Sequence, residues 1–102
     1  MSNATAIFDS KSHNWSNEPE YNQMFLTCQH NYMNNILRSR GHVFLNEVFD
    51  ALGIKRTMAA CITGWLYTEE SQSFIDFGKC MVNPNGEIEL DFNIDGVIYD
   101  KI

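Results

Sequence analysis

The last third of the chain restricts the fold most strongly, because apolar and polar residues alternate without a break over residues 87–94. Successive side chains of a β-strand point to opposite faces of a sheet, so this pattern predicts a strand with one buried and one solvated face. The residues expected on the buried face are Ile88, Leu90, Phe92 and Ile94.

Turn signals flank this strand on both sides. Asp95-Gly96 follows it at once, and an Asp-Gly pair between β-forming runs favours a two-residue type I′ hairpin leading into residues 97–99. Upstream, residues 83–86 read NPNG, with Pro where φ near −65° is needed and Gly at the turn exit. The pattern therefore predicts antiparallel strands over about 74–82, 87–94 and 97–99.

The middle of the chain predicts two helices before these strands. Asn17 suits an N-cap, Pro19 the first turn and Glu20 a capping box, and Gly41 suits a helix end. Apolar residues recur between these limits at the three- and four-residue steps of one helix face. The expected apolar stripe is Tyr21, Met24, Phe25, Cys28, Tyr32, Ile36 and Leu37.

A second, shorter helix follows, with Gly53 as a left-handed cap and Ile54 as its apolar contact. Thr57 is expected to cap a further turn, and residues 62–67 and 74–82 read as strands, the latter with Gly78 marking a bulge or close packing. The expected stripe of the second helix is Phe44, Leu45, Val48, Phe49 and Leu52.

This order predicts an α+β fold in which two N-terminal helices pack on one face of a three- to four-stranded antiparallel β-meander. Residues 17–102 are expected to form a single α+β domain, preceded by a flexible arm over residues 1–16. Residues 2–4 read SNA, as a cleaved expression tag leaves behind. Trp15 is the exception in the arm, because a Trp there is wasteful unless it docks on the domain.

Composition excludes several classes of protein. A hydrophobic content of 44% with 20% charged residues is typical of a folded domain, and no apolar run approaches the length of a membrane span. The net charge of −6 argues against a nucleic-acid partner, since phosphate binding needs clustered cations. Three widely spaced cysteines indicate a reduced, cytoplasmic protein rather than a disulfide framework. Four cations gather mid-chain, where we expect solvated helix ends, with a site for an anion or an acidic partner as the alternative: Arg38, Arg40, Lys55 and Arg56.

Five sequence blocks occur in a characteristic order, at residues 14–26, 42–57, 64–65, 75–78 and 90–102. Taken together, they resemble an uncharacterised small-protein family (a domain of unknown function) of phages and mobile elements of Gram-positive, often gut, bacteria. The resemblance implies a phage or mobile-element origin and a location in the cytoplasm of a bacterial host, and it implies no chemistry. Relatives carry Gly near Ala60 and Val near Thr63, and more residues before the first block, which implies a domain trimmed from a longer protein.

The sharpest motif match is the opening of a calcium loop, D-x-N-x-D-G, with Asp91, Asn93 and Asp95 as its ligands. Such a loop needs a bidentate Glu at its twelfth position, and Ile102 stands there. A strand and hairpin explain all of these residues, whereas the calcium loop explains half of them. We therefore expect neither a metal nor a cofactor.

No catalytic residues are predicted, and the sequence favours a protein that is not an enzyme. The cysteines and histidines lack zinc-ligand spacing, and a Cys-His nucleophilic pair would require Cys61 or Cys80 beside a His. Asp76 is the odd carboxylate, because it lies in an apolar run and needs Arg56 or a backbone donor if it points inward.

Aromatic residues make up 13% of the chain, more than so small a core needs, and Trp and Tyr are favoured at interfaces. The sequence therefore favours a non-enzymatic protein-interaction domain that binds an unknown host or phage protein. One alternative is a small enzyme or ligand-binding domain with a helix–sheet pocket holding Asp76, a His and a Cys. Another is a structural component that self-assembles through strand edges at 97–101 or 74–82; a homodimer stays open. The expected interaction surface is Trp15, Trp65, Tyr67, Glu87, Glu89 and Asp91.

Overall fold

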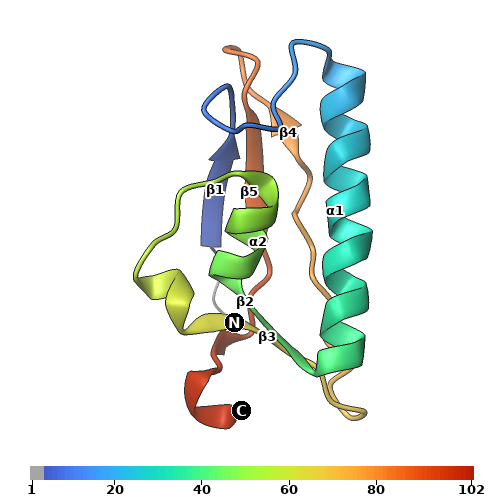
Figure 1. Ribbon diagram of the computed structural model, residues 1–102, viewed down its shortest axis with the longest axis vertical. Coiled ribbons are helices and arrows are strands. Elements are labelled where there is room, and N and C mark those ends of the chain that lie inside the picture. The colour runs from blue at the N-terminus through green and yellow to red at the C-terminus, as the bar shows by residue number, and fades with distance from the viewer. Residues whose placement is uncertain (1–3) are drawn as a thin grey trace.

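The computed structural model describes residues 4–102 and has an α+β fold, as predicted (Figure 1). Its strands form two three-stranded antiparallel sheets rather than one meander. The elements follow in the order β1 (Ala4–Phe8), α1 (Pro19–Arg40), β2 (His42–Phe44), α2 (Leu45–Leu52), the 3₁₀ turn η1 (Ala59–Cys61), β3 (Thr63–Leu66), β4 (Met81–Val82), β5 (Ile88–Phe92), β6 (Gly96–Val97) and the 3₁₀ turn η2 (Tyr99–Lys101).

The first sheet has the order β1-β5-β4, with the predicted alternating strand at its centre. The inward residues of β5 are buried and its acidic residues Glu89 and Asp91 are exposed, as the alternation predicts. The turn over residues 83–86 is also confirmed, because the Asn83 N–H donates to the Glu87 carbonyl at 2.8 Å and closes the β4–β5 hairpin.

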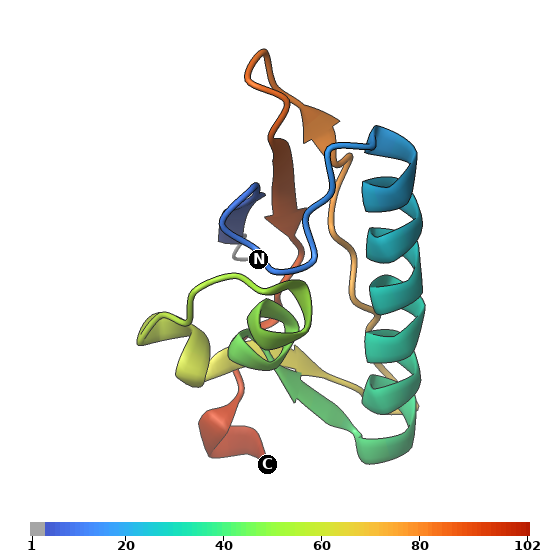
Figure 2. The ribbon, with the colours of Figure 1, turned by 45° about the horizontal axis from the view of Figure 1, so that its top comes forward.

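The predicted hairpin at Asp95-Gly96 was wrong. Gly96 and Val97 form β6, which pairs with β3 in the second sheet, of order β2-β3-β6. The Asp95 N–H donates to the Gly64 carbonyl at 2.8 Å, so the chain leaves β5 and crosses to the other sheet instead of reversing on itself. Figure 2 shows this passage from β5 toward the C-terminal turn.

The flexible N-terminal arm was also a wrong expectation for residues 4–16. Residues 4–8 form β1, which pairs with β5 over its whole length. Phe8 is fully buried, and Trp15 packs edge-on against it with ring centroids 5.4 Å apart, so Trp15 docks on the domain. These residues are ordered because β5 would otherwise present an unpaired edge, and β1 pairs with that edge. Of the suspected tag residues, Ala4 is the first residue of β1, and residues 2 and 3 lie outside the described part of the chain.

Helix α1 begins later than predicted, and its buried face overlaps the predicted stripe only in part, at Phe25, Ile36 and Leu37. Its N-cap is Glu18 rather than Asn17, while Gly41 ends it in a left-handed conformation as expected. Four residues of the predicted stripe are exposed: Cys28, and the larger side chains of Tyr21 by 45%, Met24 by 61% and Tyr32 by 58%. The buried residues are Asn22, Leu26, Met33, Asn34 and Leu37. Since two of these are asparagines, the periodicity of apolar residues alone does not reveal the buried face.

Helix α2 and the turn after it match the sequence prediction except at Phe44, which precedes the helix as the last residue of β2 and is half-buried. The other four residues of the predicted stripe are buried, Gly53 ends the helix, and the Ile54 N–H donates to the Phe49 carbonyl at 2.8 Å. Thr57 caps η1 through its hydroxyl, which accepts the Ala60 N–H at 3.1 Å. The short strand β2 was not predicted. Within residues 4–102, no helix is both long and apolar enough to cross a membrane.

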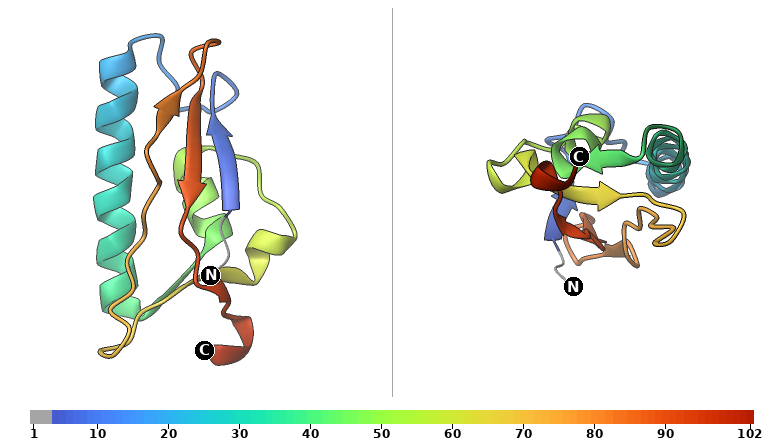
Figure 3. Two further views of the ribbon diagram at one scale, coloured as in Figure 1. Left: turned by 180° about the vertical axis from the view of Figure 1, so that it is seen from behind. Right: turned by 90° about the horizontal axis from the view of Figure 1, so that it is seen from below.

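The predicted strand over residues 74–82 is a strand only at Met81–Val82. Its first part, residues 74–79, runs between α1 and β5, without helix or strand structure over 74–77 and with a turn at 78–79 (Figure 3, left). Asn34 of α1 holds it from one side, because its amide accepts the Ile75 N–H at 2.8 Å and donates to the Ile75 carbonyl at 3.0 Å. Asn93 holds it from the other, since it accepts the Asp76 N–H at 2.9 Å and donates to the Phe74 carbonyl at 3.0 Å.

Two more asparagines repeat this arrangement elsewhere. The Asn22 amide pairs with the backbone N–H and carbonyl of Ser16, at 2.9 and 2.8 Å. The Asn46 amide pairs in the same way with Thr57, at 3.0 and 2.9 Å. Buried backbone polar groups need partners, and these side chains supply them where no neighbouring strand does. Irregular segments are thereby fixed to both helices.

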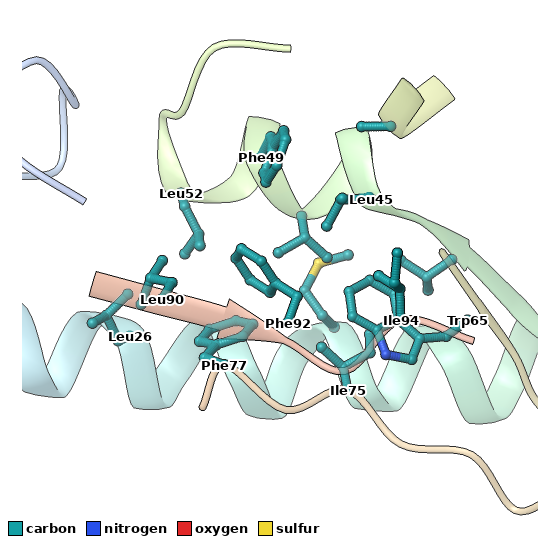
Figure 4. Packing of buried hydrophobic residues seen from close by; sticks show 14 of the residues in the cluster. Leu26, Leu45, Phe49, Leu52, Trp65, Ile75, Phe77, Leu90, Phe92 and Ile94 are labelled. Carbon is teal, nitrogen blue, oxygen red and sulfur yellow. The ribbon is translucent and has the colours of Figure 1, made fainter. Parts of the chain in front are cut away.

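The core fills the space between the first sheet, the two helices and the second sheet (Figure 4). Phe92 lies at its centre and meets three aromatic rings edge-on, with centroid distances of 5.5 Å to Phe77, 5.8 Å to Phe49 and 6.4 Å to Trp65. Such edge-to-face contacts suit the ring quadrupoles and fix the relative positions of α2, β3, β5 and the 74–79 segment.

Candidate functional site

A groove of about 640 Å³ lies on the outer face of sheet β1-β5-β4, the face turned away from α2. Figure 3 (left) looks onto this face. The sheet register places Ile7, Glu89 and Met81 side by side in one row across the three strands. Thr5 and Asp91 form the next row, and the 78–80 segment makes one wall.

The groove combines exposed apolar side chains with exposed charge. Ile7 is 46% and Met81 61% exposed, and they flank the exposed carboxylate of Glu89. Within residues 4–102, neither Glu89 nor Asp91 takes part in an ion pair, although Lys79 stands on the groove wall. Apolar surface beside unpaired charge is typical of a site that a protein partner covers.

One wall of the groove depends on an unusually close approach of two backbones. Gly78 has φ of +80°, and a Cβ at this position would lie 2.8 Å from the Asp91 carbonyl oxygen. The Asp91 N–H donates to the Phe77 carbonyl at 3.0 Å in the same place. The close packing predicted for Gly78 is therefore confirmed. Cys80 follows with a φ of +50°, a strained value for a residue other than Gly.

The predicted interaction residues do not form one surface. Glu89 and Asp91 lie in the groove, and Glu87 is half-buried at its turn end, where its carboxylate accepts from the Asn83 amide at 3.1 Å. Trp65 is fully buried, and its indole N–H donates to Asn93 at 2.9 Å, so its assignment to the surface was wrong.

The other two predicted aromatics are half-buried. Tyr67 and Trp15 both pack against the core cluster, on different parts of the molecule from the groove. The aromatic part of the predicted surface is therefore separated from its acidic part.

A second cavity, of about 180 Å³, lies between α1 and the 74–80 segment and is lined by His30, Asp76 and Cys80 among others. These are the residue types that the ligand-binding alternative required in one helix–sheet pocket. Their hydrogen bonds nevertheless serve the fold. The Asp76 carboxylate accepts the Gly78 N–H at 2.8 Å, and Arg56, its suggested partner, pairs with Asp50 instead.

The chemistry of this cavity does not favour a nucleophile. Burial raises the pKa of the Cys80 thiol, and the charge of Asp76 raises it further, whereas a nucleophilic cysteine needs a lowered pKa. The Cys80 sulfur points to the Phe77 carbonyl at 3.9 Å. His30 stacks edge-on against Phe77 at 5.4 Å and contacts the Asn34 amide, so within residues 4–102 it forms no hydrogen bond with Cys80.

The three ligands of the suggested calcium loop have separate tasks. Asn93 holds the 74–79 segment and Trp65, while the Asp95 carboxylate accepts from the Leu66 N–H at 3.0 Å and the Ser73 hydroxyl at 2.7 Å. Asp91 faces the groove on β5. In the described part of the chain, no group of three His, Cys, Asp or Glu side chains is placed to hold a metal ion.

Sequence reasoning missed a third hollow, of about 550 Å³, which is lined by Lys11, His13 and Lys55 together with Ile7 and Ile54. It lies between the end of β1 and the segment after α2, which the Ser12 hydroxyl ties together by donating to the Leu52 carbonyl at 2.6 Å. Lys11 and Lys55 are far apart in the sequence, and only the fold brings them to one site.

Comparisons with known proteins show what the chain is related to. Neither the curated proteins nor the solved structures include one that matches it. A family model does match, over residues 1–102, and its family is one of unknown function. The expectation of an uncharacterised family is thereby confirmed, and the chain belongs to the family of unknown function DUF6353.

Proposed function

We propose that this protein is a non-enzymatic protein-interaction domain, and that it binds a basic segment of a partner protein through the groove on the outer face of sheet β1-β5-β4. The observation that carries the proposal is the row of Ile7, Glu89 and Met81, in which an unpaired carboxylate lies between two exposed apolar side chains. A partner segment with a cation between apolar residues matches this row in both charge and hydrophobicity.

The arrangement of charge supports a basic partner over other partners. The chain carries a net charge of −6, and Glu89 and Asp91 lie two residues apart on the same face of the central strand. Complementary charge speeds association and rejects wrong partners, while the apolar neighbours contribute the buried area. Lys79 on the wall is the one cation that lines the described part of the groove, so it sets the register in which a partner's cations approach.

The origin of the partner follows from the resemblance of the sequence blocks, which supports a phage or mobile element and hence a host or phage protein as the binding partner. The free cysteines Cys28, Cys61 and Cys80 support a reducing compartment, the cytoplasm of a bacterial host. We propose both the host or phage partner and the cytoplasmic location.

The test compares two double variants of equal charge in affinity capture from bacterial lysate. Glu89→Lys with Asp91→Lys reverses the groove, and Glu69→Lys with Glu70→Lys reverses a pair in the exposed turn after β3, outside the groove. We expect the parent and the turn variant to retain the same protein, and the groove variant to lose it at equal salt concentration. Equal retention by both variants, or no protein retained by the parent, contradicts the proposal.

The cavity lined by His30, Asp76 and Cys80 supports a second candidate, a site for a small ligand. Its volume of about 180 Å³ is below the roughly 300–1,000 Å³ typical of ligand pockets, so it accepts a fragment of a few atoms at most. The rate at which a thiol reagent modifies Cys80 tests whether this cavity is a reactive site. If the groove is the functional site, Cys80 should react more slowly than the exposed Cys28 at every pH. Faster reaction at Cys80 would favour the ligand site.

A further inference from the structure

The edge of strand β1 provides a second site, which adjoins the outer face and shares Ile7 with the groove. We infer that an extended, acidic peptide segment of a partner protein binds there as an added strand, beside the hollow lined by Lys11 and Lys55. Adding a strand to an exposed sheet edge is a common mode of peptide recognition, because backbone hydrogen bonds supply affinity and neighbouring side chains supply specificity.

The hydrogen-bonding pattern of β5 identifies which groups of β1 are free. The Asp91 N–H donates to Phe77 on the far side of β5, so the backbone of Asp91 turns away from its register partner Thr5. In an antiparallel ladder the direction alternates with each residue. Ala4, Ala6 and Phe8 therefore bond to β5, while the N–H and carbonyl groups of Thr5 and Ile7 point to the outer edge. Within residues 4–102 these outward groups have no hydrogen-bond partner.

Strand β1 also lacks the features that normally protect a sheet edge. Edge strands usually carry a charged residue, a proline or a bulge, which prevents another strand from pairing. The sequence of β1 is ATAIF, with none of these, and its pairing with β5 is unbroken over all five residues. Figure 3 (left) shows β1 as the outermost strand, on the side away from α1.

The hollow beside this edge favours acidic side chains on the added strand. Of its carboxylates, Asp50 is paired with Arg56, and Asp9 accepts the backbone N–H of Lys11 at 2.9 Å. The ammonium groups of Lys11 and Lys55 form no ion pair within the described residues. Ile7 and Ile54 line the same hollow, so it suits a segment that alternates carboxylates with β-branched apolar residues.

The experiment uses the whole chain and two synthetic probes, acetyl-VEVEV-amide and its lysine counterpart acetyl-VKVKV-amide. Amide hydrogen exchange by NMR is measured with and without each probe. We expect the glutamate peptide to slow exchange of the Thr5 and Ile7 amides, while the Ala6 and Phe8 amides are already protected in the free protein. No change at Thr5 and Ile7, or equal protection by the lysine peptide, overturns the inference.

Three substitutions separate the contribution of the backbone hydrogen bonds to peptide binding from that of the lysine charge. Ile7→Pro removes one outward N–H and leaves the β1–β5 ladder intact, and Ile7→Ala removes the same side chain but keeps that N–H. We expect Ile7→Pro to bind the glutamate peptide about twofold to tenfold more weakly than Ile7→Ala. Lys55→Glu, which does not touch the ladder, is expected to weaken binding about twofold to fivefold. If Ile7→Pro unfolds, the Lys55→Glu affinity and the amide protection still decide; unchanged affinity in Lys55→Glu contradicts the inference.

Discussion

Strand β5 and the 74–79 segment run next to each other through the molecule, yet different hydrogen bonds hold them in place. Strand β5 is held by backbone ladders on both sides, to β1 and β4. The 74–79 segment is instead held mainly by the side chains of Asn34 and Asn93, together with a backbone bond in which the Asp91 N–H donates to the Phe77 carbonyl. Together they form the floor and one wall of the outer groove. Asparagine amides can therefore supply most of the hydrogen bonds that a full strand ladder would otherwise provide.

This difference decides what the sequence reveals. The alternation in β5 is a property of consecutive residues, so the strand and the exposure of Glu89 and Asp91 were predictable. The 74–79 segment depends on Asn34, which is 41 residues away from Ile75. Asparagines on a helix read as surface residues, and for the same reason the stripe predicted for α1 missed its buried face.

Local signals otherwise gave correct predictions where neighbours in sequence decide the structure. The end of α1 at Gly41, the buried face and end of α2, and the turn over residues 83–86 are of this kind. Strand β1 and the pairing of β6 with β3 were not predictable, because each depends on which distant edge is free. The candidate site divides in the same way: its carboxylates follow from alternation, while Ile7 and Met81 join them only through strand register.

The largest expected effect on stability comes from a substitution in β5. Phe92→Ala removes the ring at the centre of the aromatic cluster and leaves a cavity, which should lower the free energy of unfolding by about 3–5 kcal/mol. Urea denaturation followed by circular dichroism measures this. A loss below about 1 kcal/mol would contradict the central position of Phe92 in the core.

The next largest effect on stability is expected from the hydrogen bonds that hold the 74–79 segment. Asn34→Leu leaves the buried N–H and carbonyl of Ile75 without partners, at a cost of about 2–3 kcal/mol in the free energy of unfolding. Asn31→Leu is the matched control on the exposed face of the same helix and should change stability by less than about 0.5 kcal/mol. Equal effects of the two substitutions would mean that the Asn34 amide is not what holds the segment.

A smaller effect is expected where the two regions touch. Gly78→Ala places a methyl group against the Asp91 carbonyl and retains a positive φ, which should cost about 1–3 kcal/mol and move the groove wall. Gly86→Ala, with φ of +83° and no atom within 4 Å of the added Cβ, is the control for φ alone. Thermal unfolding of both variants separates the cost of the contact with Asp91 from the cost of a positive φ. A larger loss of stability in Gly86→Ala than in Gly78→Ala would contradict the close approach of Gly78 to Asp91.

The smallest effect is a pH dependence at Cys80. Because burial raises the pKa of this thiol in the folded protein, the unfolded chain releases the proton first as pH rises. Stability should therefore be constant below the ordinary thiol pKa and fall as pH rises from there to the folded value. Cys80→Ala should lose this alkaline slope, as measured by urea denaturation across the pH range. A slope that persists in Cys80→Ala assigns the titration to another group.

The most direct test of whether the Asn34 amide holds the 74–79 segment is amide hydrogen exchange at Ile75, measured by NMR in the parent and in Asn34→Leu. The account predicts that the Ile75 amide of the parent exchanges as slowly as that of Leu90 in the β5 ladder. It also predicts that Asn34→Leu speeds exchange at Ile75 far more than at Leu90. Fast exchange at Ile75 in the parent, or an unchanged rate in the variant, would contradict the claim that the Asn34 side chain holds this segment in place of a strand.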